Sequence, residues 1–278
     1  LPILMFSDAE ANLWKGAVEY MNDAIYYYSL WNGDYPYKQA TAVDGALSAG
    51  GGMEYPNVTV IGTSGSKFGL ETVIMHEVGH NWFYGILGSN ERDHPWMDEG
   101  LNSFNENSYI EKKYPNRKLI GSQGGTKMSK LFDLDQYLHK DLYYQGYLLN
   151  ARRNLDQAIE GKSNDFTMLN YGTIVYGKTA LVFDYLMAYL GNDEMDKAMH
   201  AYFEKWKFKH PQPKDLRQVL EQETAKNLSW FFYNMINSTN KIDYKILKVK
   251  EVDGKLNVLV KNKTGTAVPF SLAGIKDG

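Results

Sequence analysis

The stretch VIMHEVGHNWF, residues 73–83, carries two histidines four positions apart and a glutamate directly after the first. In a helix, residues i and i+4 lie one above the other, so the imidazoles of His76 and His80 can bind one metal ion. Glu77 is rotated by about 100° from His76, which places its carboxylate beside the metal, where it can accept a proton from water. With six histidines in the chain, chance is a poor explanation of this spacing. The stretch predicts a metal site with a general base.

A catalytic zinc ion takes a third ligand from the protein and keeps a fourth position open for water. Glu99, in PWMDEGLNSFNE at residues 95–106, is the candidate, at the expected start of a second helix. Alone it would more often be a solvated carboxylate of a first helical turn, but two histidines and a glutamate form a known zinc set. Glu106, about two turns further on, either orients a ligating imidazole or is an exposed carboxylate. His94 lies outside this spacing and is assigned to the loop.

Composition limits the other functions. The 278 residues are 44% hydrophobic with a net charge of -3, which predicts a soluble globular chain and gives no basic stripe for nucleic acid. No window approaches the roughly 18 apolar residues that span a bilayer, and LPILMF at residues 1–6 is too short for the apolar region of a signal peptide. The absence of cysteine excludes thiolate ligands and suits cytoplasm and periplasm equally, so the location stays open.

The chain changes character near residue 240. Before it, the pattern indicates a helix from residue 7 to about 31 and two short strands within 39–62, and apolar residues at helical spacing predict six further helices. These are expected at 70–87, 97–114, 142–160, 174–190, 193–206 and 213–223. After it, polar and apolar residues alternate, with a turn at Asp253-Gly254, and this pattern predicts a hairpin and another strand. We expect an α+β domain at 1–240, and at 241–278 the beginning of a β-domain.

Four separated pieces of sequence are similar to one family, the gluzincin zinc aminopeptidases of the aminopeptidase N type. They are GGMEYP at 51–56, HEVGHNWF at 76–83, WMDEG at 96–100 and YGTIVYGK at 171–178, in the family's order and at family-like intervals. The resemblance implies a thermolysin-like catalytic domain, with a small sheet and a helical lobe, followed by the start of a β-sandwich domain. It also implies one Zn²⁺ per chain and flanking domains that this stretch of sequence does not contain.

The resemblance assigns roles to further residues. Glu54 matches the glutamate that binds the free α-ammonium of the peptide substrate, beside Gly51, Gly52 and Met53, where glycines permit close backbone approach. Tyr176 matches the catalytic tyrosine that donates a hydrogen bond to the developing oxyanion, and Tyr171 matches a neighbouring tyrosine of the site. With 21 tyrosines in the chain, both assignments depend on the resemblance.

The expected activity is release of one amino acid at a time from the amino terminus of a peptide. A thermolysin-type endopeptidase would share the zinc set without needing Glu54, and a non-catalytic peptide-binding relative would not need Glu77 with all three ligands. Three positions depart from the family pattern, which commonly has glycine at Tyr84 and asparagine at Asp98 and Tyr55. None of the departures removes an expected ligand or the base.

Overall fold

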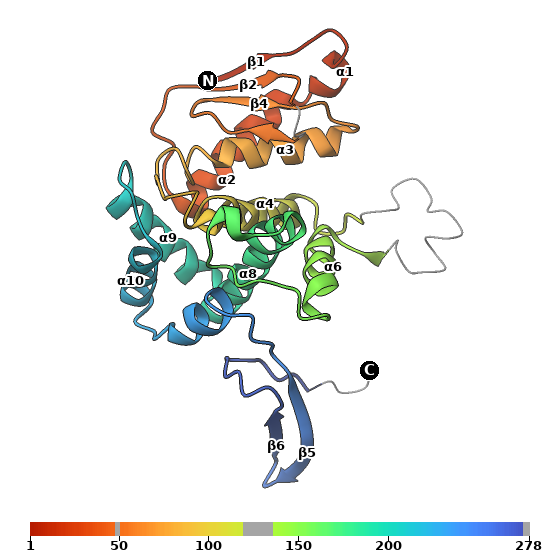
Figure 1. The fold of residues 1–278 in the computed structure, drawn as a ribbon, viewed down its shortest axis with the longest axis vertical. Helices are drawn as coiled ribbons and strands as arrows, with labels where there is room; N and C mark the ends of the chain where they lie inside the picture. Colours follow the sequence, from red (N-terminus) through yellow and green to blue (C-terminus); the bar gives the residue numbers. More distant parts are fainter. Residues whose placement is uncertain (48–50, 119–135, 275–278) are drawn as a thin grey trace, which may run out of the picture.

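The computed structural model describes residues 1–47, 51–118 and 136–274. The chain begins with a four-stranded mixed sheet (Figure 1). In sheet order its strands are β1 (Pro2–Met5), β2 (Ala40–Asp44), β4 (Val58–Ile61) and β3 (Gly52–Met53). The first three are parallel, and β3 pairs antiparallel with β4. The prediction of two strands within 39–62 was therefore one strand short, and β1 was not predicted. Both missed strands are too short to show an alternating pattern.

Helices α1 (Ala11–Trp14) and α2 (Ala17–Asn32) follow β1, α3 (Lys67–Gly79) follows β4, and all three lie near the sheet (Figure 1). The single helix predicted from residue 7 is divided in two, because the chain leaves helical hydrogen bonding at Lys15 and Gly16. Helix α3 is capped by Ser66, whose hydroxyl accepts a hydrogen bond from the backbone amide of Gly69. Its buried apolar face includes Leu70 and Val78, so α3 is fixed beneath the sheet.

Helix α3 ends at Gly79, eight residues before the predicted end at Leu87. Beyond it, hydrogen bonds run from Gly85 N to His80 O at 2.9 Å and from Leu87 N to Trp82 O at 2.8 Å. The turn includes Tyr84 at φ 110°, a backbone conformation that residues other than glycine rarely adopt. A tyrosine gives no sequence signal of this conformation, which is why the prediction continued the helix.

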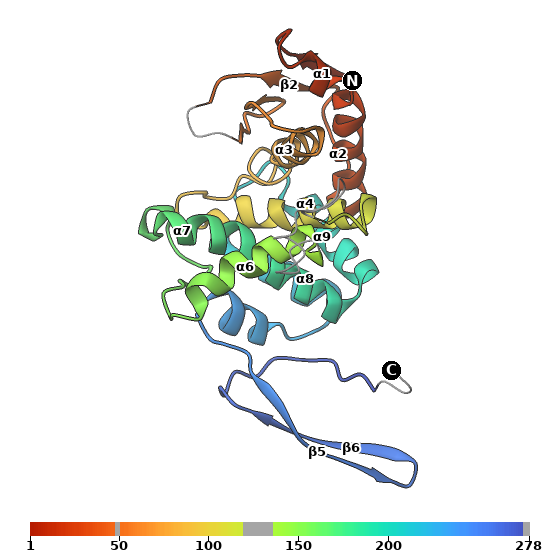
Figure 2. The ribbon, with the colours of Figure 1, turned by 90° about the vertical axis from the view of Figure 1, so that its right-hand side faces the viewer.

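The helical lobe follows α3 and has α4 (Glu99–Lys113) at its centre, between α3 and the later helices (Figure 2). Its other helical elements are η1 (Pro95–Met97), α6 (His139–Ala151), η3 (Ser163–Asp165), α7 (Met168–Asn170), η4 (Tyr171–Lys178), α8 (Thr179–Leu190), α9 (Asn192–Trp206), α10 (Pro213–Thr224) and η5 (Phe231–Ile236). Of these, η4 and η5 are π-helices. The helix predicted at 142–160 is α6, which begins three residues earlier and ends nine residues earlier than predicted. The helix predicted at 174–190 begins earlier, as α7, and continues through η4 into α8.

The interior of the lobe contains a large aromatic core. Trp96, Phe183 and Phe231 are essentially inaccessible to solvent, and their rings meet at centroid distances of 6.0 Å and 5.2 Å. Such burial stabilises the lobe by about 1.5–3 kcal/mol for each large apolar side chain. In the part of the chain that the structure describes, no helix combines the length and the apolar character needed to span a membrane.

The hairpin predicted after residue 240 is confirmed. It consists of β5 (Tyr244–Val252) and β6 (Lys255–Asn262) and projects away from the lobe (Figures 1 and 2). Asp253 and Gly254 both have positive φ, 51° and 70°, as a type I′ turn requires. The further strand that we expected is not formed within the described residues 263–274. Without a strand beside it, the hairpin leaves apolar side chains of both strands exposed.

Candidate active site

The three expected ligands converge where α3 meets α4. His76 lies in the last turn of α3, His80 caps its end, and Glu99 is the first residue of α4. The Nε2 atoms of the two histidines are 3.2 Å apart, and each lies 3.2 Å from Glu99 Oε2. Ligand atoms around a tetrahedral zinc ion with bonds of about 2.0–2.2 Å lie about 3.3–3.5 Å apart. The three atoms therefore have nearly the separation that a shared zinc ion requires.

The donor set is also electrostatically suited to a cation. Burial disfavours the charged form of His76, but hydrogen bonds with Glu106 and Glu99 raise its pKa to about 10. Burial likewise opposes ionisation of Glu106, yet hydrogen bonds from His139 and His76 lower its pKa to about 2. The pocket thus attracts positive charge strongly enough to hold protons on its imidazoles. A divalent ion competes with those protons for the same nitrogens.

Both imidazoles are held by a second partner through their other nitrogen. Glu106 Oε2 lies 2.9 Å from Nδ1 of His76, and Asp98 Oδ1 lies 2.6 Å from Nδ1 of His80. A carboxylate at Nδ1 fixes the proton there and leaves Nε2 with a free lone pair for a metal ion. The geometry agrees with the orienting alternative for Glu106. Sequence reasoning missed this position of Asp98, although its place directly before Glu99, at the same helix end, was a usable signal.

Glu106 is itself fixed by helix α6. Nε2 of His139 lies 3.2 Å from Glu106 Oε1, and the hydroxyl of Tyr143 donates to the same oxygen at 3.1 Å. Because Glu106 is 7% exposed, these contacts leave little freedom for its carboxylate. Neither His139 nor Tyr143 was a sequence candidate, since both lie on a separate helix with no spacing that relates them to α4.

Glu77 lies beside the ligand triangle and is 6% exposed, with its Oε2 atom buried and without a hydrogen-bond partner among the described residues. Burial raises the pKa of this carboxyl to about 7, although the neighbouring imidazoles of His76 and His80 oppose the shift. Gly52 makes room for the side chain, because a Cβ on Gly52 would lie 2.3 Å from Glu77 Cδ. The carboxyl is therefore poised to exchange a proton near neutral pH.

Glu54 lies on the open side of the same cluster. Its carboxylate, the Glu77 carboxylate and an imidazole nitrogen of His80 all lie within 4.8 Å of one another. It also lines a cavity of about 190 Å³, together with Glu91 and Tyr171. Glu91 was not a sequence candidate. Met53 is 37% exposed, and Gly51, at φ 65°, has nothing within 4 Å of where a Cβ would lie.

Tyr171 and Tyr176 lie on the π-helix η4. The ring of Tyr176 stacks on His76, with centroids 6.0 Å apart and an angle of 18° between the planes, and the two tyrosine rings are 5.8 Å apart. In an α-helix, residues five apart would be rotated by about 140°, so the wider π-turn brings both rings to one side. Burial and the nearby Glu99 carboxylate raise the pKa of Tyr176, so its hydroxyl stays protonated.

The sequence model of the peptidase family M1 domain matches residues 17–235. The chain belongs to peptidase family M1.

Its M1 relatives include aminopeptidase M1-A of Oryza sativa subsp. japonica, 24% identical over 195 residues, which make up 69% of this chain and 20% of that protein. The puromycin-sensitive aminopeptidase of Caenorhabditis elegans is 24% identical over 225 residues, or 77% of this chain and 22% of that protein. The chain therefore spans about a fifth of the length of these relatives.

Solved structures share its fold. Legionella pneumophila aminopeptidase A matches with a TM-score of 0.63 at 17% identity, over 94% of this chain and 29% of that one. The M1 zinc metallopeptidase from Deinococcus radiodurans matches with a TM-score of 0.56 at 14% identity, over 81% and 44%. The predicted α+β catalytic fold, with a small sheet and a helical lobe, is confirmed.

The positions at which this M1 chain departs from the expected pattern have distinct environments. Tyr84 adopts φ 110° in the turn after His80, a conformation that glycine adopts without strain. Tyr55 is 57% exposed next to Glu54. His94 stays outside the cluster, as expected, and its Nδ1 lies 2.5 Å from the carboxylate of Glu160.

Proposed function

We propose that this chain is the catalytic part of a zinc aminopeptidase that hydrolyses the first peptide bond of peptides with a free amino terminus. One observation carries the proposal: the carboxylate of Glu54 lies within 4.8 Å of both the Glu77 carboxylate and His80. A cation bound by Glu54 is therefore held next to the base and the ligand triangle. This limits the distance between a substrate's terminal ammonium and the bond that is cleaved.

Zinc is the metal that fits the proposed donors, and we propose one ion per chain, held by His76, His80 and Glu99. Two imidazoles and a carboxylate that leave one position open are a known catalytic zinc set. When bound, zinc supplies a Lewis acid that polarises a carbonyl group and increases the acidity of water. Asp98 and Glu106 would orient the two imidazoles, because each carboxylate would accept a hydrogen bond from an Nδ1–H group.

The remaining steps are assigned to side chains of this chain. The buried carboxylate of Glu77 accepts a proton from the attacking water and passes it to the leaving amine. The hydroxyl of Tyr176 donates a hydrogen bond to the oxygen on which negative charge develops. Glu54 pairs with the α-ammonium, in the opening that Tyr171 also lines. Gly51 directly precedes β3, and Gly52 and Met53 form this strand, which leads to Glu54. We propose that the peptide runs along its edge.

The thermolysin-type endopeptidase remains the second candidate, because it would use the same zinc donors. The position of Glu54 favours the aminopeptidase, since a peptide chain that extended further on this side would run into the half-buried carboxylate of Glu54. A purely peptide-binding protein is less favoured, because Glu77 is buried without a partner for Oε2, at a cost that binding alone would not require.

We also propose a domain boundary near residue 240, with 241–278 beginning a separate β-domain. The family match ends at residue 235, and the β5–β6 hairpin leaves apolar side chains on its surface. The relatives' greater length supports flanking domains in the whole protein. The substrates of that whole protein are part of the same proposal.

Replacement of Glu54 by glutamine tests the substrate assignment. Losing the charge-assisted pair with the α-ammonium is expected to raise KM for an aminoacyl anilide by about 10–100-fold. The zinc content should stay at the wild-type level. The matched control is Glu19→Gln, because Glu19 is a carboxylate on α2 with 67% of its side chain exposed. An unchanged KM in Glu54→Gln would show that this carboxylate does not bind the amino terminus.

Replacement of Glu106 by glutamine tests the support of His76. Loss of the carboxylate at Nδ1 is expected to weaken zinc binding by about 10–100-fold, measured by competition with a chromogenic chelator. Glu111→Gln on the same helix is the control, because Glu111 pairs with Lys140 near the surface. Equal zinc affinities of the two variants would contradict the orienting role.

A further inference from the structure

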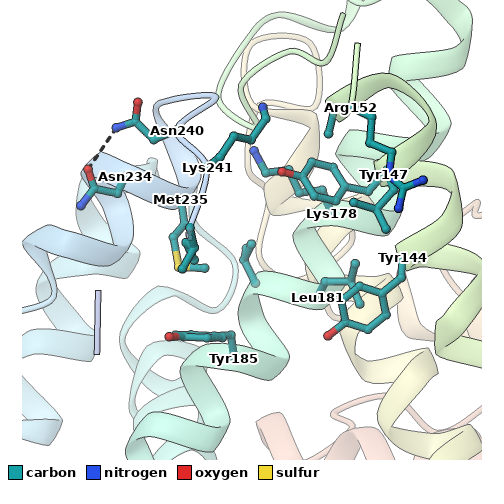
Figure 3. Close-up of a pocket in the computed structure, with 14 residues that line it drawn as sticks. Tyr144, Tyr147, Arg152, Lys178, Leu181, Tyr185, Asn234, Met235, Asn240 and Lys241 are labelled. Atoms are coloured by element: carbon teal, nitrogen blue, oxygen red, sulfur yellow. Dashed lines mark hydrogen bonds between the residues drawn. The ribbon is translucent and has the colours of Figure 1, made fainter. Parts of the chain in front are cut away.

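A second cavity, of about 410 Å³, lies in the helical lobe and shares no lining residue with the cavity beside Glu54. Helix α6 and the η4–α8 junction form one side of it, and η5 and the segment before β5 form the other (Figure 3). Its volume is in the range of small-molecule sites. Lys178 lines this cavity and is the last residue of η4, two positions after Tyr176 of the candidate active site.

The charges that line this cavity are all positive. Arg152, Lys178 and Lys241 contribute to its wall, and no aspartate or glutamate does. Lys241 is neutralised by Asp156, which lies behind the wall with its side chain 1% exposed and accepts from Lys241 Nζ at 2.8 Å and 2.7 Å. Within the described residues, Arg152 and Lys178 have no ion pair.

Lys178 is the notable cation of the three because it is 5% exposed. Its ammonium donates one hydrogen bond, to Ser238 O at 3.4 Å, and lies 5.4 Å from the centre of the Tyr147 ring. Figure 3 places Lys178, Tyr147 and Lys241 at the same end of the cavity. Burial lowers the pKa of Lys178 to about 8, despite the opposing effect of Asp156. The ammonium has therefore lost more hydration than its partners replace.

Most of the remaining wall is apolar, although Asn234 and Asn240 contribute two amide side chains. It includes Leu181 and Val182, which are 7% and 6% exposed, and Met235, which is 8% exposed. Tyr144 and Leu148 are 44% and 39% exposed at the opening. A ligand that suits this site must combine one anionic group for Lys178 with an apolar body for the wall.

We propose that this cavity binds a small apolar monocarboxylate, with its carboxylate paired to Lys178 and its apolar chain against Leu181, Val182 and Met235. A carboxylate supplies the ion pair that Lys178 lacks and hydrogen-bond acceptors for its remaining N–H groups. A neutral ligand would bury the ammonium further without compensating its charge. The anionic head and the apolar chain are therefore both required.

The test is isothermal titration calorimetry of the intact chain with octanoate, and with octanamide and octylamine as neutral and cationic probes of the same length. Octanoate should bind saturably, and octanamide and octylamine at least about tenfold more weakly, as expected for the loss of a charge-assisted bond. Lys178→Met should weaken octanoate binding at least about tenfold. Lys248 is exposed on β5 and does not line the cavity, so Lys248→Met should leave the Kd for octanoate unchanged. Methionine matches the length of the lysine stem and removes a desolvated charge, so the fold should be retained.

Ala151→Leu is a second variant that leaves Lys178 in place. Ala151 is a lining residue at the end of α6, so added side-chain volume there should exclude octanoate at unchanged Tm. Equal affinities for octanoate and octanamide, equal binding by the wild type and Lys178→Met, or absence of octanoate binding would each overturn the proposal.

Discussion

Replacement of Glu77 by glutamine is expected to lower kcat for an aminoacyl anilide by about 10²–10⁴-fold, the usual contribution of a general base. Glutamine has the same shape as glutamate but cannot take up a proton from water. It should also fit against Gly52, whose lack of a side chain leaves room for the end of residue 77. The loss should appear in kcat measured at saturating substrate, because Glu77 is assigned to the chemical step.

The zinc content of the Glu77→Gln protein separates loss of the base from loss of the metal. Glu77 is not one of the three proposed ligands, so the variant should bind zinc as the wild type does, and elemental analysis measures this directly. A zinc-loaded Glu77→Gln protein with wild-type kcat would show that another group accepts the proton.

Removal of zinc is expected to lower the hydrolysis rate at least about 10³-fold, because the Lewis acid contributes several kcal/mol to stabilisation of the transition state. Dialysis against a chelator should abolish activity, and stoichiometric Zn²⁺ should restore it. The metal should also raise Tm, since it binds the folded donor set and not the unfolded chain. Mass spectrometry under native conditions should show one zinc ion per chain.

Two histidine variants test which residues bind the zinc ion. His76→Gln removes one corner of the ligand triangle and should lose both zinc and activity. His94→Gln changes a histidine that pairs with Glu160 outside the triangle, so it should keep both. Retention of zinc by His76→Gln, or loss of zinc from His94→Gln, would place the metal elsewhere.

The spacing of the proposed ligands along each helix could be predicted because it follows from local geometry. His76 and His80 lie one turn apart near a helix end, and Glu99 and Glu106 lie two turns apart on the next helix, so spacing in the sequence corresponds to position in space. The hairpin around Asp253-Gly254 could be predicted for the same reason. The roles assigned to these ligands remain predictions.

The features that sequence reasoning missed depend on distant contacts or unusual backbone. His139 and Tyr143 reach Glu106 from another helix, and no short-range pattern relates them to it. The π-form of η4 and the positive φ of Tyr84 are backbone conformations that these residue types do not indicate. Strand β1 pairs with β2 across nearly forty residues, and four residues are too few to reveal it.

Product analysis of one peptide shows whether the zinc-loaded protein requires a free amino terminus in its substrate. A hexapeptide with a free amino terminus and its N-acetylated form are incubated separately with the zinc-loaded protein, and the products are followed by mass spectrometry. We expect the free peptide to lose one residue at a time from its amino terminus, and the acetylated peptide to stay intact because it has no ammonium for Glu54. Cleavage of both peptides at the same internal bond, or of neither, would contradict this expectation.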